Sequence, residues 1–332
     1  MSDHIDEYLK TGLKDLWFPI CPSTFIAETP VSLRRLGIKL VLWRDGGGRL
    51  HALEDHCPHR GAPLSAGIVL NDRIACPYHG VEVRSDGMVV KVPGSPGCKL
   101  EGSRAARAFH VQERAGYVFI FNHARPTDTP PPLRLPEELE SDEYAAFPCY
   151  AEWRTDYRYI QDNVMDPMHG TFVHKQSHSM FQGTIEAKFR LRDTDTGFIF
   201  EKTNQQNVNF DWAEFGDTGF HWQRLSIPYP KTAGPGGPFT IIGSFTPISD
   251  NLSAVVHWRC RKVSGWQRSA WQFLFKAKLE ALHWGVLEQD RALLEKMDPA
   301  ANQRESLYDH DLGLVRLRRH LRQLAQQRLA AG

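Results

Sequence analysis

The sequence predicts an α+β protein in which a small antiparallel β domain precedes a larger domain of strands and helices. Three observations indicate this class. Short β-rich runs separated by Gly and Asp turns fill residues 39–121, a proline-rich stretch covers 126–142, and helical and strand-like patterns alternate beyond residue 143. The chain has 332 residues, more than one compact domain usually holds, so two domains are expected.

The first domain is predicted over residues 1–125. Its strand-like runs are bounded by turn residues such as Asp45-Gly46-Gly47-Gly48, and they cover residues 39–43, 88–92 and 117–121. In the stretch that follows, five prolines have no backbone N–H to donate to a sheet, namely Pro126, Pro130, Pro131, Pro132 and Pro136. We therefore expect a linker at 126–142 and a second domain at 143–332.

The second domain is predicted to contain three helices and several strands. Helices are expected at about 157–169, 266–297 and 312–330, with strand-like runs at 197–200 and 254–258. In the long helix, apolar residues recur every three or four positions and predict a buried stripe of Phe275, Leu279, Leu282, Val286, Leu293 and Met297. The last helix is rich in arginine, which we interpret as a solvated or interface face rather than a nucleic-acid arm.

Charge and composition exclude several classes of protein. There are 40 Lys and Arg against 39 Asp and Glu, so the net charge of +1 gives no general attraction to nucleic acid or anionic membranes. No apolar run is long enough to span a membrane, and the start Met1-Ser2-Asp3-His4 does not resemble a signal peptide. A cytoplasmic protein is expected, whose 6 cysteines are thiols or metal ligands rather than disulfides.

Two short loops each combine one cysteine with one histidine. Residues 57–61 read Cys-Pro-His-Arg-Gly and residues 76–80 read Cys-Pro-Tyr-His-Gly. A zinc finger usually takes its cysteines from one loop and its histidines from another, so this interleaving is different. It allows two thiolates to bind one iron and two imidazoles the other, which is the ligand pattern of a Rieske 2Fe–2S centre. The predicted cluster ligands are Cys57, His59, Cys76 and His79.

Two other interpretations of these loops are a mononuclear zinc site and unrelated buried cysteines beside turn histidines. Colour and iron content separate them, since a colourless protein with one zinc ion would contradict the cluster. The other cysteines are expected to be free thiols: Cys21, Cys98, Cys149 and Cys260.

A second candidate metal site follows in the second domain. His169 and His174 are five residues apart on either side of Gly170, and one carboxylate would complete a two-histidine, one-carboxylate triad for ferrous iron. We select Asp290 because it falls on the apolar stripe of the long helix, where an unpaired carboxylate is costly. Alternatives are that His169 is a core histidine, that His174 pairs with His178, and that Asp290 caps a buried arginine.

Together the two motifs resemble the terminal oxygenase (α) subunits of Rieske non-haem iron oxygenases. The motifs are C-x-H-x16-C-x2-H at 57–79 and N-x2-D-x2-H-x4-H at 163–174. The resemblance implies a Rieske domain followed by a catalytic domain with an antiparallel sheet flanked by helices. It also implies roles for Asn163 and Asp166 at the catalytic site, with Asp166 joining His169 to His79 of a neighbouring subunit in a head-to-tail homotrimer.

The resemblance further implies an oxygenase that uses O2 to hydroxylate, dihydroxylate or demethylate a small aromatic substrate, as in aromatic catabolism. The chain has no dinucleotide fingerprint and no plant-type cluster motif, so a separate ferredoxin or flavin-containing reductase is expected to deliver electrons from NAD(P)H. An alternative is a Rieske electron-transfer protein with an inactive second domain.

Two sets of residues are candidates for the substrate pocket, and each has two interpretations. Trp212, Phe215, Phe220 and Trp222 either line an aromatic pocket or pack in the core. Arg154 and Arg224 either bind a substrate carboxylate or form surface salt bridges.

Overall fold

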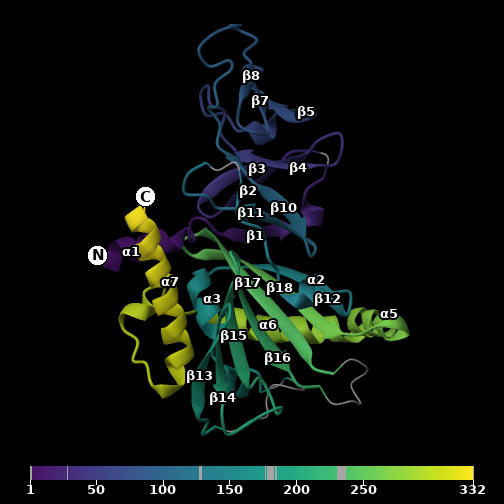
Figure 1. Ribbon diagram of the computed structural model, residues 1–332, viewed down its shortest axis with the longest axis vertical. Helices are drawn as coiled ribbons and strands as arrows, with labels where there is room; N and C mark the ends of the chain where they lie inside the picture. The colour runs from purple at the N-terminus through teal and green to yellow at the C-terminus, as the bar shows by residue number, and fades with distance from the viewer. Residues whose placement is uncertain are drawn as a thin grey trace.

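The computed structural model describes residues 2–27, 29–126, 129–175, 177, 183, 185–229 and 237–331. The molecule is elongated, with the N-terminal sheets at one end and a large sheet with its helices at the other (Figure 1). No helix in the described ranges combines the length and apolar character needed to cross a membrane. The predicted α+β class is confirmed.

The N-terminal part contains three antiparallel sheets. Their strand orders are β1-β11-β10, β2-β3-β4-β9 and β5-β6-β7-β8. The predicted strand at 117–121 is β11, and the glycines at 46–48 form the turn between β3 and β4. The strands are β1 (Trp17–Pro22), β2 (Val31–Arg35), β3 (Ile38–Arg44), β4 (Leu50–Glu54), β5 (Ile68–Leu70), β6 (Arg73–Ala75), β7 (Glu82–Arg84), β8 (Val89–Lys91), β9 (Ala108–Phe109), β10 (Val111–Arg114) and β11 (Tyr117–Phe121).

The C-terminal part is built on one seven-stranded antiparallel sheet of order β12-β18-β17-β16-β15-β14-β13. Side chains alternate between its two faces, so one face packs on α3 and the other on the N-terminal part. The strands are β12 (Tyr144–Trp153), β13 (Phe189–Thr194), β14 (Gly197–Lys202), β15 (Trp212–Asp217), β16 (His221–Ile227), β17 (Phe239–Ser249) and β18 (Leu252–Lys262).

The helices surround this sheet. They are α1 (Ser2–Lys10), α2 (Glu137–Glu140), α3 (Tyr157–Val164), α4 (His169–Val173), α5 (Gly265–Leu274), α6 (Glu280–Leu294) and α7 (Leu312–Ala331), with short 3-10 turns at Ser23–Phe25, Leu64–Ala66, Ala301–Gln303 and Asp309–Asp311.

The single helix predicted at 157–169 is wrong, because the structure has two short helices there. Asp156 caps the first helix by accepting a hydrogen bond from the Arg158 backbone N–H at 2.9 Å, and the helix ends at Val164. Pro167 has no backbone N–H and disfavours helical backbone at the preceding residue, so the helix cannot continue. His169 consequently begins α4 instead of ending α3.

The long predicted helix is present, but its buried stripe differs from the prediction. A π-helical turn at Phe275–Leu279 joins α5 to α6. A π turn holds one residue more than an α turn and therefore rotates the face that follows. Beyond it, the buried residues are His283, Asp290 and Leu294, whereas three predicted stripe residues are exposed, namely Leu282, Leu293 and Met297.

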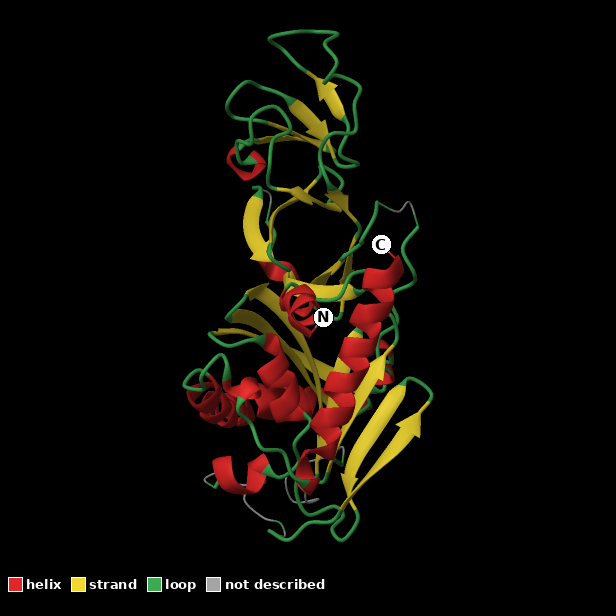
Figure 2. Cartoon of the chain, turned by 90° about the vertical axis from the view of Figure 1, so that its left-hand side faces the viewer, coloured by secondary structure: helices red, strands yellow, loops and turns green. Residues whose placement is uncertain are grey.

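The C-terminal helix α7 runs beside the sheet, and its end lies close to α1 (Figure 2). The arginine face of α7 is not simply solvated, because several of its guanidinium groups pair with carboxylates of this chain. Arg318 lies 2.6 Å from Asp162 of α3, and Arg322 lies 3.2 Å from Asp6 of α1. The helix is therefore fastened to both parts of the molecule.

The N-terminal and C-terminal parts share a core and direct hydrogen bonds. The backbone N–H of Trp17 donates to the Gly219 carbonyl at 2.9 Å, and the buried Arg35 guanidinium contacts Tyr150 at 2.6 Å and Glu152 at 3.0 Å. Residues 129–136, between the two parts, form neither helix nor strand.

A buried histidine at this junction gives a prediction about stability. Burial, together with the charges of Arg107 and His110, lowers the pKa of His123 from 6.5 to about 4. The folded chain therefore keeps this imidazole neutral where the unfolded chain binds a proton, so stability falls as the pH drops below 6.5. We expect the free energy of unfolding to fall by about 1 kcal/mol through His123 when the pH is lowered from 7.5 to 5.5.

Urea unfolding of the wild type and His123→Gln at both pH values measures this effect. The variant should lose less stability than the wild type on acidification. Equal losses in the two proteins would contradict the assignment.

Candidate metal centres

The two Cys-His loops have the same backbone design. The first follows β4 and the second follows β6, and in each the cysteine carbonyl accepts from the N–H of the glycine four residues later. These bonds join Gly61 to Cys57 at 2.8 Å and Gly80 to Cys76 at 3.0 Å. Both glycines have positive φ, +75° and +69°, which other residues rarely adopt. The glycine in each motif thus closes a tight loop around its ligand pair.

The side chains of these loops fit an iron–sulfur cluster. Cys57 and Cys76 are 1% and 3% exposed, while His59 and His79 are exposed, with ring centroids 4.8 Å apart. Burial raises the pKa of the Cys57 thiol; the His59 backbone N–H opposes this rise, and the Cys76 thiol adds to it. The thiols therefore face inward and the imidazoles outward, as a cluster bound by one cysteine pair and one histidine pair requires.

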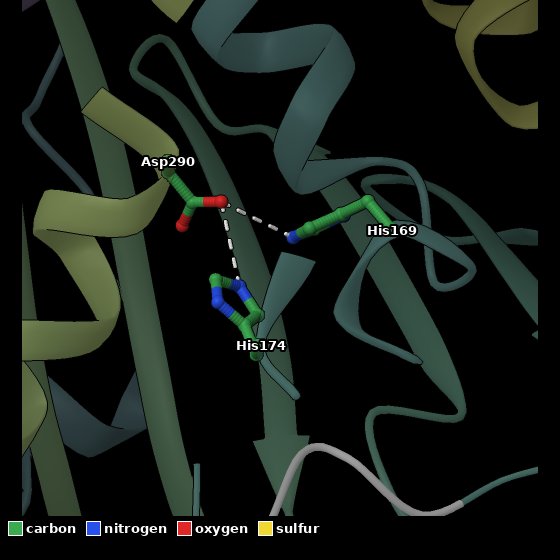
Figure 3. Close-up of side chains that lie close together, drawn as sticks. All are labelled: His169, His174 and Asp290. Atoms are coloured by element: carbon green, nitrogen blue, oxygen red, sulfur yellow. Dashed lines mark ion pairs between the residues drawn. The ribbon is translucent and has the colours of Figure 1, made fainter. Parts of the chain in front are cut away.

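The second group brings His169, His174 and Asp290 together from α4, its C-terminal end and α6 (Figure 3). Asp290 Oδ1 lies 3.6 Å from His169 Nε2 and 3.4 Å from His174 Nε2. One donor atom from each residue lies within 4.8 Å of the other two. These three donors converge as a facial triad for ferrous iron requires.

The second nitrogen of each imidazole is held by a neighbour. His169 Nδ1 lies 2.6 Å from the Asp166 backbone carbonyl, and His174 Nδ1 lies 2.9 Å from Gln289 Oε1. Both partners accept, so the Nδ1–H tautomer is fixed and Nε2 is left to bind metal. Gln289 was not predicted, because its only signal in the sequence is its position next to Asp290.

The charges around the triad also fit a metal ion. Among the described residues, no Lys or Arg lies within ion-pair distance of the Asp290 carboxylate, which is buried together with His174. Burial lowers the pKa of His174 despite the nearby carboxylate, which favours the neutral imidazole that metals bind. Asn163 donates from Nδ2 to Asp290 Oδ1 at 3.5 Å.

Two of the alternatives for this group do not fit these contacts. Asp290 contacts two histidines and caps no arginine in the described ranges, and His169 is directed at Asp290 rather than packed away from it. The third alternative involves His178, which lies outside the described residues. Asp166 contributes its carbonyl to His169, while its carboxylate, 30% exposed, lies 4.0 Å from His169 Nδ1.

A mostly apolar cavity opens beside the triad. Its polar walls include Asn163, Gln223 and His257, and Gln223 Oε1 is buried without a hydrogen-bond partner in the described part of the chain. The apolar lining consists of Trp153, Ile160, Val164, Phe210, Leu225, Ile241, Gly243, Val286 and Leu287.

The four aromatic residues considered for the pocket are not part of this lining. Phe215, Phe220 and Trp222 belong to the packed cores, and Trp212 borders a different hollow. The reason is strand alternation: in β16, Gln223 and Leu225 face the cavity, so Trp222 faces the opposite side.

The two arginines considered for a substrate carboxylate also lie elsewhere. Arg224 pairs with Glu138 at 2.8 Å and Glu214 at 2.6 Å, and Arg154 is exposed.

A second group of two histidines and one aspartate lies away from the cavity. Asp217 Oδ2, at the end of β15, lies 3.2 Å from His221 Nε2 and 3.6 Å from His320 Nε2 of α7. Burial opposes ionisation of Asp217, but the two nearby imidazoles outweigh it and hold the pKa of Asp217 well below its usual range. This group ties α7 to the sheet.

Two family models match the chain. The Rieske [2Fe-2S] domain matches residues 16–103, and the vanillate O-demethylase oxygenase C-terminal domain matches residues 153–327, more than half of the chain. The first match contains both Cys-His loops, and the second contains the His169, His174 and Asp290 group.

Individual relatives agree with these models. The chain is 34% identical over 164 residues to a vanillate O-demethylase oxygenase subunit of Pseudomonas sp. (strain HR199 / DSM 7063), covering 49% of this chain and 46% of the relative. The chain thus spans less than half the length of that relative. A Comamonas testosteroni protein, named as an iron–sulfur subunit of a toluene-4-sulfonate monooxygenase system, is 32% identical, with 88% of this chain and 89% of the relative covered.

Solved structures share the fold. Dicamba monooxygenase bound to dicamba aligns with a TM-score of 0.75 at 21% identity, covering 96% of this chain and 98% of that chain. The oxygenase of a carbazole 1,9a-dioxygenase complex with ferredoxin aligns with a TM-score of 0.77 at 21% identity, covering 97% and 92%.

Proposed function

Because the chain belongs to the Rieske non-haem iron oxygenases, we propose that it is a terminal oxygenase acting on a small aromatic substrate. The reaction is hydroxylation, dihydroxylation or oxidative demethylation, with electrons supplied from outside the chain. The observation that carries the proposal is the convergence of His169, His174 and Asp290 on one wall of an apolar cavity.

Two metal groups would supply the chemistry when bound: one-electron transfer by a Rieske cluster, and activation of dioxygen at a mononuclear ferrous iron. Cys57, His59, Cys76 and His79 would hold the cluster, and His169, His174 and Asp290 would hold the iron. An electron carrier with an inactive second domain would need neither this converged triad nor the cavity beside it.

The protein's own groups prepare the iron site. Gln289 and the Asp166 carbonyl hold the two imidazoles in the tautomer that presents Nε2. The apolar cavity wall excludes bulk water from the substrate, and Gln223 Oε1 offers an unpaired acceptor within it.

We propose that electrons reach the iron from the cluster of a neighbouring subunit in a homotrimer. Within one chain, the cluster loops belong to the N-terminal end of the elongated molecule and the triad to the opposite part (Figure 1). His79 is exposed and the Asp166 carboxylate is 30% exposed, so both are accessible to a second subunit. Asp166 would then join His169 to the neighbouring cluster ligand.

The electrons are proposed to come from a separate ferredoxin or flavin-containing reductase, which takes them from NAD(P)H. The carbazole oxygenase that shares this fold was solved as a complex with ferredoxin. We place the protein in the cytoplasm, with domains at 1–125 and 143–332 joined by the linker at 126–142.

Product analysis with isotopically labelled dioxygen tests the function. The holoprotein, a surrogate reductase and a panel of aromatic acids and aryl methyl ethers should give an oxygenated product. Label in a new ring hydroxyl indicates hydroxylation, whereas formaldehyde with an unlabelled phenol indicates demethylation of a methyl ether. Reduction of the cluster without any oxygenated product, in protein that contains all its iron, would favour the electron carrier.

A further inference from the structure

A second hollow adjoins the cavity beside the triad. The two share the side chains of Ile241, His257, Val286 and Leu287 as a common wall. At the far end the lining becomes more polar, with Ser177, Tyr229, Arg259 and His283. The two hollows therefore adjoin at this wall, with the three candidate iron ligands in the first and a guanidinium group in the second.

Arg259 is an unpaired charge in the second hollow. Its side chain is 2% exposed, and both Nη1 and Nη2 are buried with no hydrogen-bond partner among the described residues. In the same part of the chain, no carboxylate lies within ion-pair distance of Arg259. Its closest stabilising contact is the ring of Trp284, whose centroid is 5.2 Å from Cζ.

The two other arginines that are buried among the described residues are satisfied, whereas both terminal nitrogens of Arg259 are unpaired. Arg35 contacts Tyr150, Glu152 and two backbone carbonyls, and Arg261 contacts the Gly237 carbonyl and the ring of Trp271. An unpaired buried guanidinium is costly, and arginine remains charged even where burial lowers its pKa. A bound anion would remove this cost.

Burial lowers the pKa of Arg259 and the nearby Glu280 carboxylate opposes this shift, but Glu280 pairs with Lys276 at 2.7 Å and lines neither hollow. Burial lowers the pKa of His257 to about 3, and the positive charge of Arg259 is the second cause of this shift. The imidazole is therefore neutral at physiological pH. Tyr229 Oη lies 3.0 Å from His283 Nε2. Of the described residues that line the two hollows, only Asp290 of the triad carries a carboxylate.

We propose that Arg259 binds the anionic group of the substrate, so that the substrate class is an aromatic carboxylate or sulfonate. His257 and Arg259 are two residues apart on the same face of β18, which places the guanidinium about 7 Å further along the strand. The aromatic ring then lies against Ile241, Val286 and Leu287, and the reacting group is directed to the triad. Planar acid groups suit the paired N–H donors of arginine.

This inference rests on the proposed function, and a binding measurement tests it without turnover. The probes are 4-methoxybenzoate, toluene-4-sulfonate and the uncharged 4-methoxybenzyl alcohol, titrated calorimetrically into anaerobic holoprotein. We expect at least one anion to bind the wild type about 10- to 100-fold more tightly than the alcohol. The tighter of the two anions identifies the carboxylate or the sulfonate as the preferred acid.

Substitutions assign the effect to Arg259. Arg259→Gln should weaken binding of the preferred anion about 10- to 100-fold and leave the alcohol within about threefold. Arg259→Lys keeps a cation in the same place and should retain part of the preference, which guards against misfolding of the glutamine variant. Arg224→Gln is the matched control, because Arg224 pairs with two glutamates outside the cavity, and it should leave all three dissociation constants unchanged.

The inference is overturned if neither anion binds, if the wild type binds the alcohol as tightly as both anions, or if Arg259→Gln weakens all three ligands equally. Turnover is measured separately. Oxygenation of a neutral substrate without anion preference removes the role of Arg259 and leaves the oxygenase. Selective anion binding without any oxygenation supports the role of Arg259 and contradicts the oxygenase function.

Discussion

Replacing His169 by alanine is expected to remove the mononuclear iron and leave the cluster intact. The variant keeps His174 and Asp290, but two donors do not hold ferrous iron as firmly as three. Iron content should fall from three to two per chain, and the visible absorption of the cluster should not change. Oxygenation should fall by about 1000-fold or more, since the site that activates dioxygen is lost.

His221→Ala provides the control for this experiment. His221 also lies beside an aspartate and a second histidine, but that group is next to α7 and lines neither hollow. This variant should keep three irons per chain. Three irons in His169→Ala, or undiminished turnover, would exclude His169 as an iron ligand.

Replacing Asp166 by asparagine is expected to stop turnover while both metal centres stay loaded. The backbone carbonyl that holds His169 is unchanged by the substitution, and asparagine Oδ1 can still accept from the Met168 N–H, now 2.7 Å from the carboxylate. What is lost is the negative charge between His169 and the proposed partner imidazole. We expect the rate of cluster reoxidation in a single turnover to fall about 100-fold.

Asp193→Asn is the control for Asp166. Asp193 is an exposed carboxylate of β13 that pairs with Arg316 at 3.1 Å, away from the triad. The Asp193→Asn variant should reoxidise its cluster at the wild-type rate. If Asp166→Asn does so as well, Asp166 is not on the electron path.

Much of the fold could be predicted where the signal is local. The run at 117–121 is β11, and the predicted terminal helix at 312–330 is α7, because each has a clear pattern of its own. The break of the predicted helix at Pro167 was missed although proline is visible in the sequence. The rotation of the long helix could not be predicted, because the π turn at Phe275–Leu279 inserts one residue without a distinct sequence signal.

The candidate metal-binding residues can be identified from the amino-acid sequence alone. Short spacings such as Cys57 to His59 or His169 to His174 restrict side chains to one loop or one turn, so their convergence can be anticipated without the fold. Asp290 was also selected from sequence, because a carboxylate on an apolar helix face needs a partner.

The groups that surround these candidates become visible once the chain is folded. Gln289 contacts His174 from a helix 115 residues away in the chain, and Trp222 faces away from the cavity that its neighbour Gln223 lines. Arg259 and Arg224 both lie on strands, yet Arg224 pairs with two glutamates whereas Arg259 has no such partner among the described residues. Whether a buried charge is satisfied depends on groups distant in sequence, and their positions are fixed when the sheet and helices pack.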